Sequence, residues 1–114
     1  MDIQELRREA QTMQPQLTAD RRRLHRNPEA GAVLPETVAY VKERLTEMGY
    51  HPQELGGGLT ATVTGTDTGR CILLRADMDA LRGQEQSGLS FRSENGCMHA
   101  CGHDMHTAML LGAA

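Results

Sequence analysis

The stretch CILLRADMDAL, residues 71–81, runs from a short apolar segment directly into two aspartates. Consecutive apolar residues indicate a strand that is covered on both faces, as in a sheet with helices on either side. Asp77 and Asp79 come at the end of this predicted strand, which is where α/β sheets place their ligands. The stretch therefore predicts an α/β fold with a site at the edge of its sheet.

Helical patterns precede and follow the predicted strand. Residues 2–26 are charged and helix-prone, with a break expected at Pro15 because proline removes a backbone donor. A second helix is predicted to start at Pro35 and to end at Gly49. A last helix is predicted to start near Asp104. The order helix, helix, strands, helix is typical of an α/β sandwich.

Shorter elements are predicted between the helices. Residues 50–55 predict a weak edge strand because they contain a proline, and the glycines at 56–58 predict a turn. Residues 59–65 alternate between apolar residues and threonine, which predicts a half-buried strand. A turn is expected at residues 66–69 and a loop at residues 82–96.

Composition and charge exclude several classes of partner. The 114 residues carry 12 basic and 15 acidic side chains, with one Phe and no Trp. Such a chain offers neither a phosphate-neutralising surface nor aromatic platforms for bases, so no nucleic-acid partner is expected. No apolar run approaches the roughly 20 residues that span a bilayer, and no secretory signal pattern is visible. No membrane partner and a cytoplasmic location are therefore expected.

Residues 96–106, GCMHACGHDMH, contain two of the three cysteines and three of the five histidines. Thiolate and imidazole are good ligands for Zn²⁺, and imidazole also binds Mn²⁺. Cys101 and His103 flank Gly102, which lets the backbone turn both donors toward one ion. Asp104 is placed to orient His103 or to bind directly. This spacing predicts a divalent-metal site.

The two aspartates after the apolar run support the same interpretation. Asp77 and Asp79 would repel each other unless a cation or a basic group lay between them. A structural zinc finger is excluded, because its two ligand pairs lie about a dozen residues apart, whereas most of the cysteines and histidines here are crowded into residues 96–106. Two alternatives to a metal site stay open: residues with only structural roles, and a cysteine hydrolase that uses Cys101 with His103 or His106.

Three motifs occur in a characteristic order: LHRNPEAG at residues 24–31, LRADMDAL at 74–81 and MHACGHDMHTAMLLGAA at 98–114. In order and spacing they resemble the M20 metallopeptidase family, and most closely its M20D amidohydrolases. That branch contains hippurate hydrolase, N-acyl-L-amino-acid amidohydrolase and auxin-conjugate hydrolases. The resemblance implies a catalytic domain of helices packed on a mixed sheet around one or two divalent ions.

The resemblance also implies roles for individual residues. Cys101 and His103 correspond to metal ligands, Asp79 to a catalytic aspartate beside the metal, and Asp77 to a supporting residue. Asp104 keeps the supporting role that its position next to His103 predicts. The expected reaction is hydrolysis of the amide bond of a hippurate-like N-acyl amino acid or small peptide by metal-activated water. Zn, Mn, Ni and Co are not distinguished by these donors.

Residues 1–114 are expected to be the N-terminal portion of the catalytic domain, because the last apolar helix stops abruptly at Ala114. The family's general-base glutamate, its later histidine ligands and its lid and dimerisation domain have no counterpart in this sequence. The chain by itself is therefore expected to be inactive, and homo-oligomerisation is open for the complete protein. The alternative is a non-catalytic metal-binding or structural remnant of such an enzyme.

Overall fold

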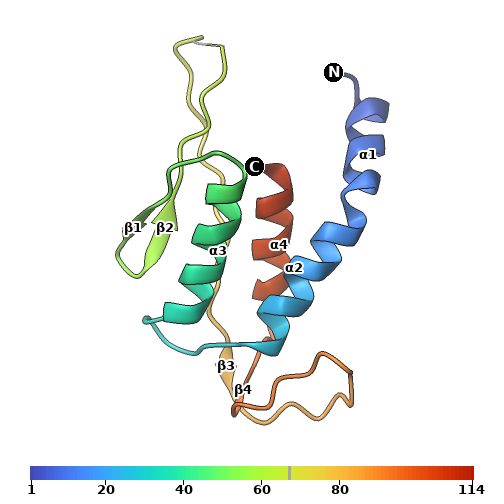
Figure 1. Ribbon diagram of the computed structural model, residues 1–114, viewed down its shortest axis with the longest axis vertical. Coiled ribbons are helices and arrows are strands. Elements are labelled where there is room, and N and C mark those ends of the chain that lie inside the picture. The colour runs from blue at the N-terminus through green and yellow to red at the C-terminus, as the bar shows by residue number, and fades with distance from the viewer. Residues whose placement is uncertain (67) are drawn as a thin grey trace.

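The computed structural model describes residues 1–66 and 68–114. Four helices make up most of the regular structure: α1 (Ile3–Thr12), α2 (Gln14–Arg26), α3 (Pro35–Glu47) and α4 (His103–Ala113). Two antiparallel strand pairs accompany them: β1 (Gln53–Leu55) with β2 (Gly58–Thr60), and β3 (Leu81–Arg82) with β4 (Cys97–Met98). Figure 1 shows α2, α3 and α4 side by side, with the β1–β2 hairpin next to α3. No helix among the described residues has the length and apolar character needed to cross a membrane.

The start of each of the first three helices follows from local sequence. Asp2 and Glu5 form a capping box at α1, in which each side chain accepts from the other's backbone N–H. Pro15 and Pro35 lie in the first turns of α2 and α3, where a missing N–H removes no helical hydrogen bond. Met13 separates α1 from α2. The predicted break and the predicted helix starts are confirmed.

A small apolar core joins α2, α3 and α4. Leu24, Val41 and Leu111 are its buried centre, and burying each such side chain contributes about 1.5–3 kcal/mol. Five partly buried side chains surround it: Tyr40, Leu45, Met48, Leu59 and Met78. Near the end of α4, a Cβ added at Gly112 would lie 2.5 Å from Cδ2 of Leu17. The bare glycine therefore lets α4 lie close against α2.

The strands are shorter than the sequence predicts. Of the strand predicted at residues 59–65, only the first two residues belong to a strand, β2. Residues 71–77 form no strand among the described residues. A strand is defined by backbone pairing, and no ladder partner for residues 71–77 occurs in the described part of the chain. The aliphatic side chains of this segment are 60–90% exposed: Ile72, Leu73 and Leu74. The prediction of a strand covered on both faces is therefore wrong for this structure.

The turns and loops between the helices match the sequence more closely. The glycine turn is confirmed, since Gly56 and Gly57 have positive φ between β1 and β2. The turn expected at residues 66–69 includes residue 67, which lies outside the described residues. The loop at residues 82–96 is closed at its base because β3 pairs with β4, a pairing that the sequence did not predict.

The buried carboxylate of Glu85 organises this closed loop. Its oxygens accept from the backbone N–H of Ser93 at 3.1 Å and from Oγ of Ser87 at 2.5 Å. Its Oε1 also lies 2.9 Å from Nε2 of His25, and only 7% of the side chain is exposed. Burial raises the pKa of Glu85, but the hydrogen bonds and the His25 contact outweigh it and lower the pKa from 4.5 to about 2.

The depressed pKa of Glu85 predicts a loss of stability in acid. A group whose pKa is lower in the folded state stabilises the fold above its unfolded-state pKa, here 4.5, and the contribution is lost as the pH falls toward 2. We expect Glu85→Gln to lower the free energy of unfolding at neutral pH and to flatten its decline below pH 4.5, measured by urea unfolding at a series of pH values. Glu94→Gln, which changes a side chain that is 74% exposed, is the matched control. Identical pH profiles for Glu85→Gln and the unaltered chain would contradict the prediction.

Candidate metal centre

The segment that carries Asp77 and Asp79 is fixed to the rest of the molecule by the residue that follows it. Ala80 forms a parallel bridge with Ala30, and its N–H donates to the backbone oxygen of Glu29 at 2.8 Å. The Glu29 carboxylate in turn accepts from two backbone N–H groups in the first turn of α3, at 2.6 and 3.2 Å. One glutamate thus links the start of α3 to the segment that presents the aspartates.

Asp79 determines which nitrogen of His103 carries the proton. The backbone oxygen and Oδ1 of Asp79 lie 2.8 and 2.9 Å from Nδ1 of His103. Because both oxygens are acceptors, Nδ1 carries the proton and Nε2 presents its lone pair. Nε2 lies 3.4 Å from Oδ2 of Asp77. Metal-binding histidines are commonly oriented in this way by an oxygen acceptor on the far ring nitrogen.

His106 approaches Asp77 from the next turn of α4. Residues three apart share a helix face, and the rings of His103 and His106 stack with centroids 5.6 Å apart. Nδ1 of His106 lies 2.7 Å from Oδ1 of Asp77, and Oγ1 of Thr107 donates to the Asp77 backbone oxygen at 2.9 Å. The hydrogen bond from His106 lowers the pKa of Asp77, so this carboxylate is ionised at neutral pH.

Three side chains therefore converge as candidate metal ligands. Asp77, His103 and His106 each offer one ligand atom, and these atoms lie within 4.8 Å of one another. One carboxylate and two imidazoles suit Zn²⁺ and several neighbouring divalent ions. Their side chains are 27, 23 and 48% exposed, respectively, so water can reach the cluster. Three protein ligands that leave a position for water are typical of catalytic rather than structural zinc sites.

The cluster contains only part of the predicted site. Asp77, Asp79 and His103 meet there, whereas Cys101 is exposed and is not one of the three converging residues. The binding of one ion by Cys101 and His103 together stays a prediction. His106 belongs to the cluster but was not among the predicted ligands. Its spacing of three residues from His103 in a predicted helix is the signal that could have identified it.

Asp104, predicted to support His103, bonds to α2. Its Oδ2 accepts from Nε of Arg21 at 2.8 Å and lies 2.7 Å from Nδ1 of His25. Asp104 is 1% exposed. Burial raises its pKa, but the bonds from His25 and Arg21 outweigh it and lower the pKa. The carboxylates that contact the His103 ring are those of Asp79 and Asp77.

Comparisons with known proteins identify the family that the chain resembles. Residues 73–114 match peptidase family M20/M25/M40. The chain is 47% identical to N-acetyl-L-cysteine deacetylase of Bacillus subtilis over 106 residues, which are 90% of this chain and 26% of that protein. It is 40% identical to N-acyl-L-amino acid amidohydrolase of Geobacillus stearothermophilus over 119 residues, which are 100% of this chain and 32% of that protein.

A solved structure confirms the predicted fold class. The Bacillus subtilis YXEP protein, a dinuclear metal binding peptidase from the M20 family, is similar with a TM-score of 0.82 at 38% identity. The likeness covers 89% of this chain and 29% of that one. The chain thus spans about a quarter to a third of the length of the proteins it matches.

The cluster predicts that His106 contributes to metal affinity. We expect His106→Ala to weaken Zn²⁺ binding by more than the roughly 10–100-fold that is typical of losing an outer-shell partner, because it removes a ligand atom. Isothermal titration calorimetry of the 114-residue chain measures the effect. His51→Ala, which removes an exposed histidine outside the cluster, is expected to bind as the unaltered chain does. Equal affinities for both variants would exclude His106 as a ligand.

Proposed function

The chain belongs to peptidase family M20/M25/M40, and we propose that it supplies part of the divalent-metal centre of a hydrolase that cleaves amide bonds. The proposed substrates are N-acyl amino acids of the hippurate kind or small peptides. The names of the two relatives, a deacetylase and an amidohydrolase, support this class. The single observation that carries the proposal is the convergence of Asp77, His103 and His106.

The residues of the cluster fit a metal-dependent hydrolase. A divalent ion bound there would lower the pKa of a water molecule and polarise the carbonyl of the scissile amide. Asp77, His103 and His106 would hold it, with Cys101 proposed as a further ligand from the turn before α4. Asp79 is the proposed catalytic aspartate: it keeps the proton on Nδ1 of His103, so that Nε2 stays available as a ligand.

We propose that residues outside this chain complete the site. Among the described residues, the converging group contains no glutamate, and Asp77 and Asp79 already bond to histidines. Residues 1–114 are thus proposed to be the N-terminal portion of the catalytic domain. The general-base glutamate, the remaining ligands and the lid and dimerisation domain would come from the rest of the protein. The chain by itself would bind metal without turnover.

Several features of the complete protein stay predictions. The donors present do not select among Zn, Mn, Ni and Co, nor between one ion and two. The cytoplasmic location, the absence of nucleic-acid and membrane partners and homo-oligomerisation likewise rest on the sequence.

The proposal predicts metal binding without hydrolysis by the 114-residue chain. We expect calorimetric titration with Zn²⁺, Mn²⁺ or Co²⁺ to detect one or two bound ions, and we expect no amino acid to be released from hippurate or N-acetylcysteine. Absence of metal binding would contradict the metal centre. Turnover by the chain alone would contradict the division of the site between this chain and other residues.

A separate prediction concerns Cys101 as a metal ligand. If its thiolate is a ligand, Cys101→Ser should lower metal affinity strongly in calorimetric titrations, whereas Cys71→Ser, at another exposed cysteine, should not. Unchanged metal content in Cys101→Ser would remove Cys101 from the ligand set. In the complete protein, inhibition by a thiol alkylator under metal saturation, without inhibition by a chelator, would favour cysteine hydrolase chemistry instead.

A further inference from the structure

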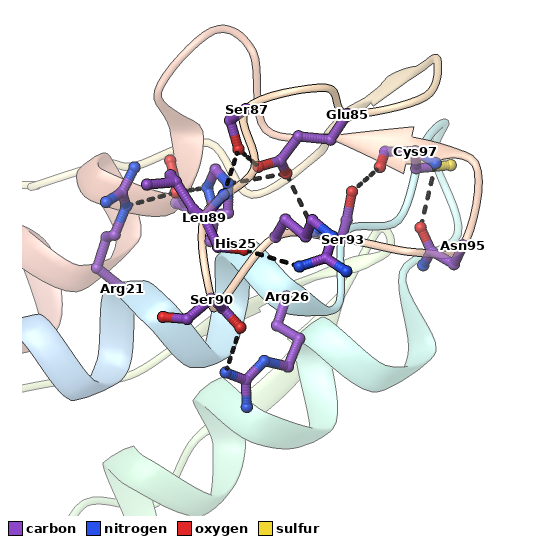
Figure 2. A network of polar contacts seen from close by, with 12 residues as sticks. Arg21, His25, Arg26, Glu85, Ser87, Leu89, Ser90, Ser93, Asn95 and Cys97 are labelled. Carbon is purple, nitrogen blue, oxygen red and sulfur yellow. Dashed lines mark hydrogen bonds and ion pairs between the residues drawn. The ribbon is translucent and has the colours of Figure 1, made fainter.

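A buried histidine on α2 lies between two carboxylates from distant parts of the chain. His25 is 7% exposed. Its Nδ1 lies 2.7 Å from Oδ2 of Asp104, and its Nε2 lies 2.9 Å from Oε1 of Glu85. A carboxylate oxygen thus lies close to each ring nitrogen. Figure 2 shows the ring reaching from α2 toward Glu85.

The first of these carboxylates belongs to the opening turn of α4. The residue before that helix, Gly102, has a left-handed backbone and provides no side-chain cap. Side-chain contacts from α2 hold this turn instead, since Arg21 and His25 both bond to Oδ2 of Asp104. At the other end of α4, Gly112 packs against Leu17 of α2. Helix α4 is therefore fixed to α2 near both of its ends.

Holding Asp104 also fixes how α4 is rotated about its axis. Successive residues of an α-helix are about 100° apart around the axis. Asp104, Ala108 and Leu111 are buried, which places their common face against the body of the molecule. His103 and His106 lie on a different face, directed toward Asp77. A rotation that released Asp104 would carry both histidines away from Asp77.

The second carboxylate links the same histidine to the loop at residues 83–96. Glu85 accepts from Ser93 and Ser87 within that loop, and Oγ of Ser93 donates to the backbone oxygen of Cys97 at 2.5 Å. The chain continues from Cys97 through β4 to the turn before α4. His25 thus contacts both the helix that carries the cluster and the loop that leads into it.

We propose that His25 is a positioning residue for the metal centre, which through Asp104 and Glu85 holds the first turn of α4 where His103 and His106 face Asp77. His25 itself touches none of the three candidate ligands in the contacts described. The inference rests on the proposed function, because it requires that the cluster bind a divalent cation. It adds to that function a residue remote in sequence, from the first of the three motifs.

The test compares metal affinity with stability in the 114-residue chain. His25→Ala removes both ring contacts, and His25→Gln keeps one amide donor. Tyr40→Phe is the matched control, because it removes the hydroxyl that donates to the buried Asp20 and links α2 to α3 away from the cluster. Co²⁺ absorption titration gives the dissociation constant, and thermal unfolding followed by circular dichroism gives the stability of each variant.

We expect His25→Ala to weaken Co²⁺ binding by about 10–100-fold, His25→Gln to weaken it less, and added imidazole to restore part of the affinity of His25→Ala. Tyr40→Phe should lose stability and keep the affinity of the unaltered chain. Equal affinity in His25→Gln, His25→Ala and the unaltered chain would overturn the inference.

An equal loss of affinity in Tyr40→Phe would also overturn it, by showing that any loss of stability weakens the site. If His25→Ala does not fold, His25→Gln decides the question, and failure of His25→Gln to fold would make His25 a folding residue instead. Absence of Co²⁺ binding by the unaltered chain would count against the proposed metal centre itself, and would remove the basis of the inference with it.

Discussion

The hydrogen bonds between Asp79 and Nδ1 of His103 join two segments that are 24 residues apart in the sequence. They position the ring and occupy Nδ1, so that Nε2 is the nitrogen near Asp77. The first segment is fixed by the bridge between Ala30 and Ala80, and the second begins helix α4. The contacts of His106 and Thr107 with Asp77 join the same two segments, so the aspartates and the histidines form one unit.

Among the described residues, three histidines around the start of α4 each place Nδ1 next to a carboxylate oxygen. Asp79 pairs with His103, Asp77 with His106, and Asp104 with His25. The first two pairs are partly exposed and the third is buried, where Arg21 is a second partner of the Asp104 carboxylate. Carboxylate–imidazole pairs thus occur both at the candidate metal cluster and where α4 is attached to α2.

The sequence predicted the helices better than the strands for a physical reason. Caps, prolines and apolar spacing act within one turn, so Pro35 and Gly49 mark the ends of α3 without knowledge of the rest of the chain. A strand needs a partner at a distance, and the apolar run at residues 71–77 has none among the described residues. Composition alone therefore gave the wrong structure for this segment, although the likeness to solved structures agrees with the fold class.

The residues of the candidate site were also predicted only in part. Asp77, Asp79 and His103 could be recognised because they fall in two short motifs. His106 was missed because helical spacing was not applied to it. The contacts of His25 could not be predicted, because they depend on how α2 packs against α4 and on the path of the loop at residues 83–96.

The exposed segment around Ile72, Leu73 and Leu74 has a practical consequence for the isolated chain. An extended run of aliphatic residues is a template on which a further backbone can add by strand pairing. Its neighbour Cys71 is exposed as well, and an accessible thiol is open to oxidation between molecules. High concentrations of the chain therefore favour aggregation through this stretch. Dilute, reducing conditions are expected to keep the molecules monomeric.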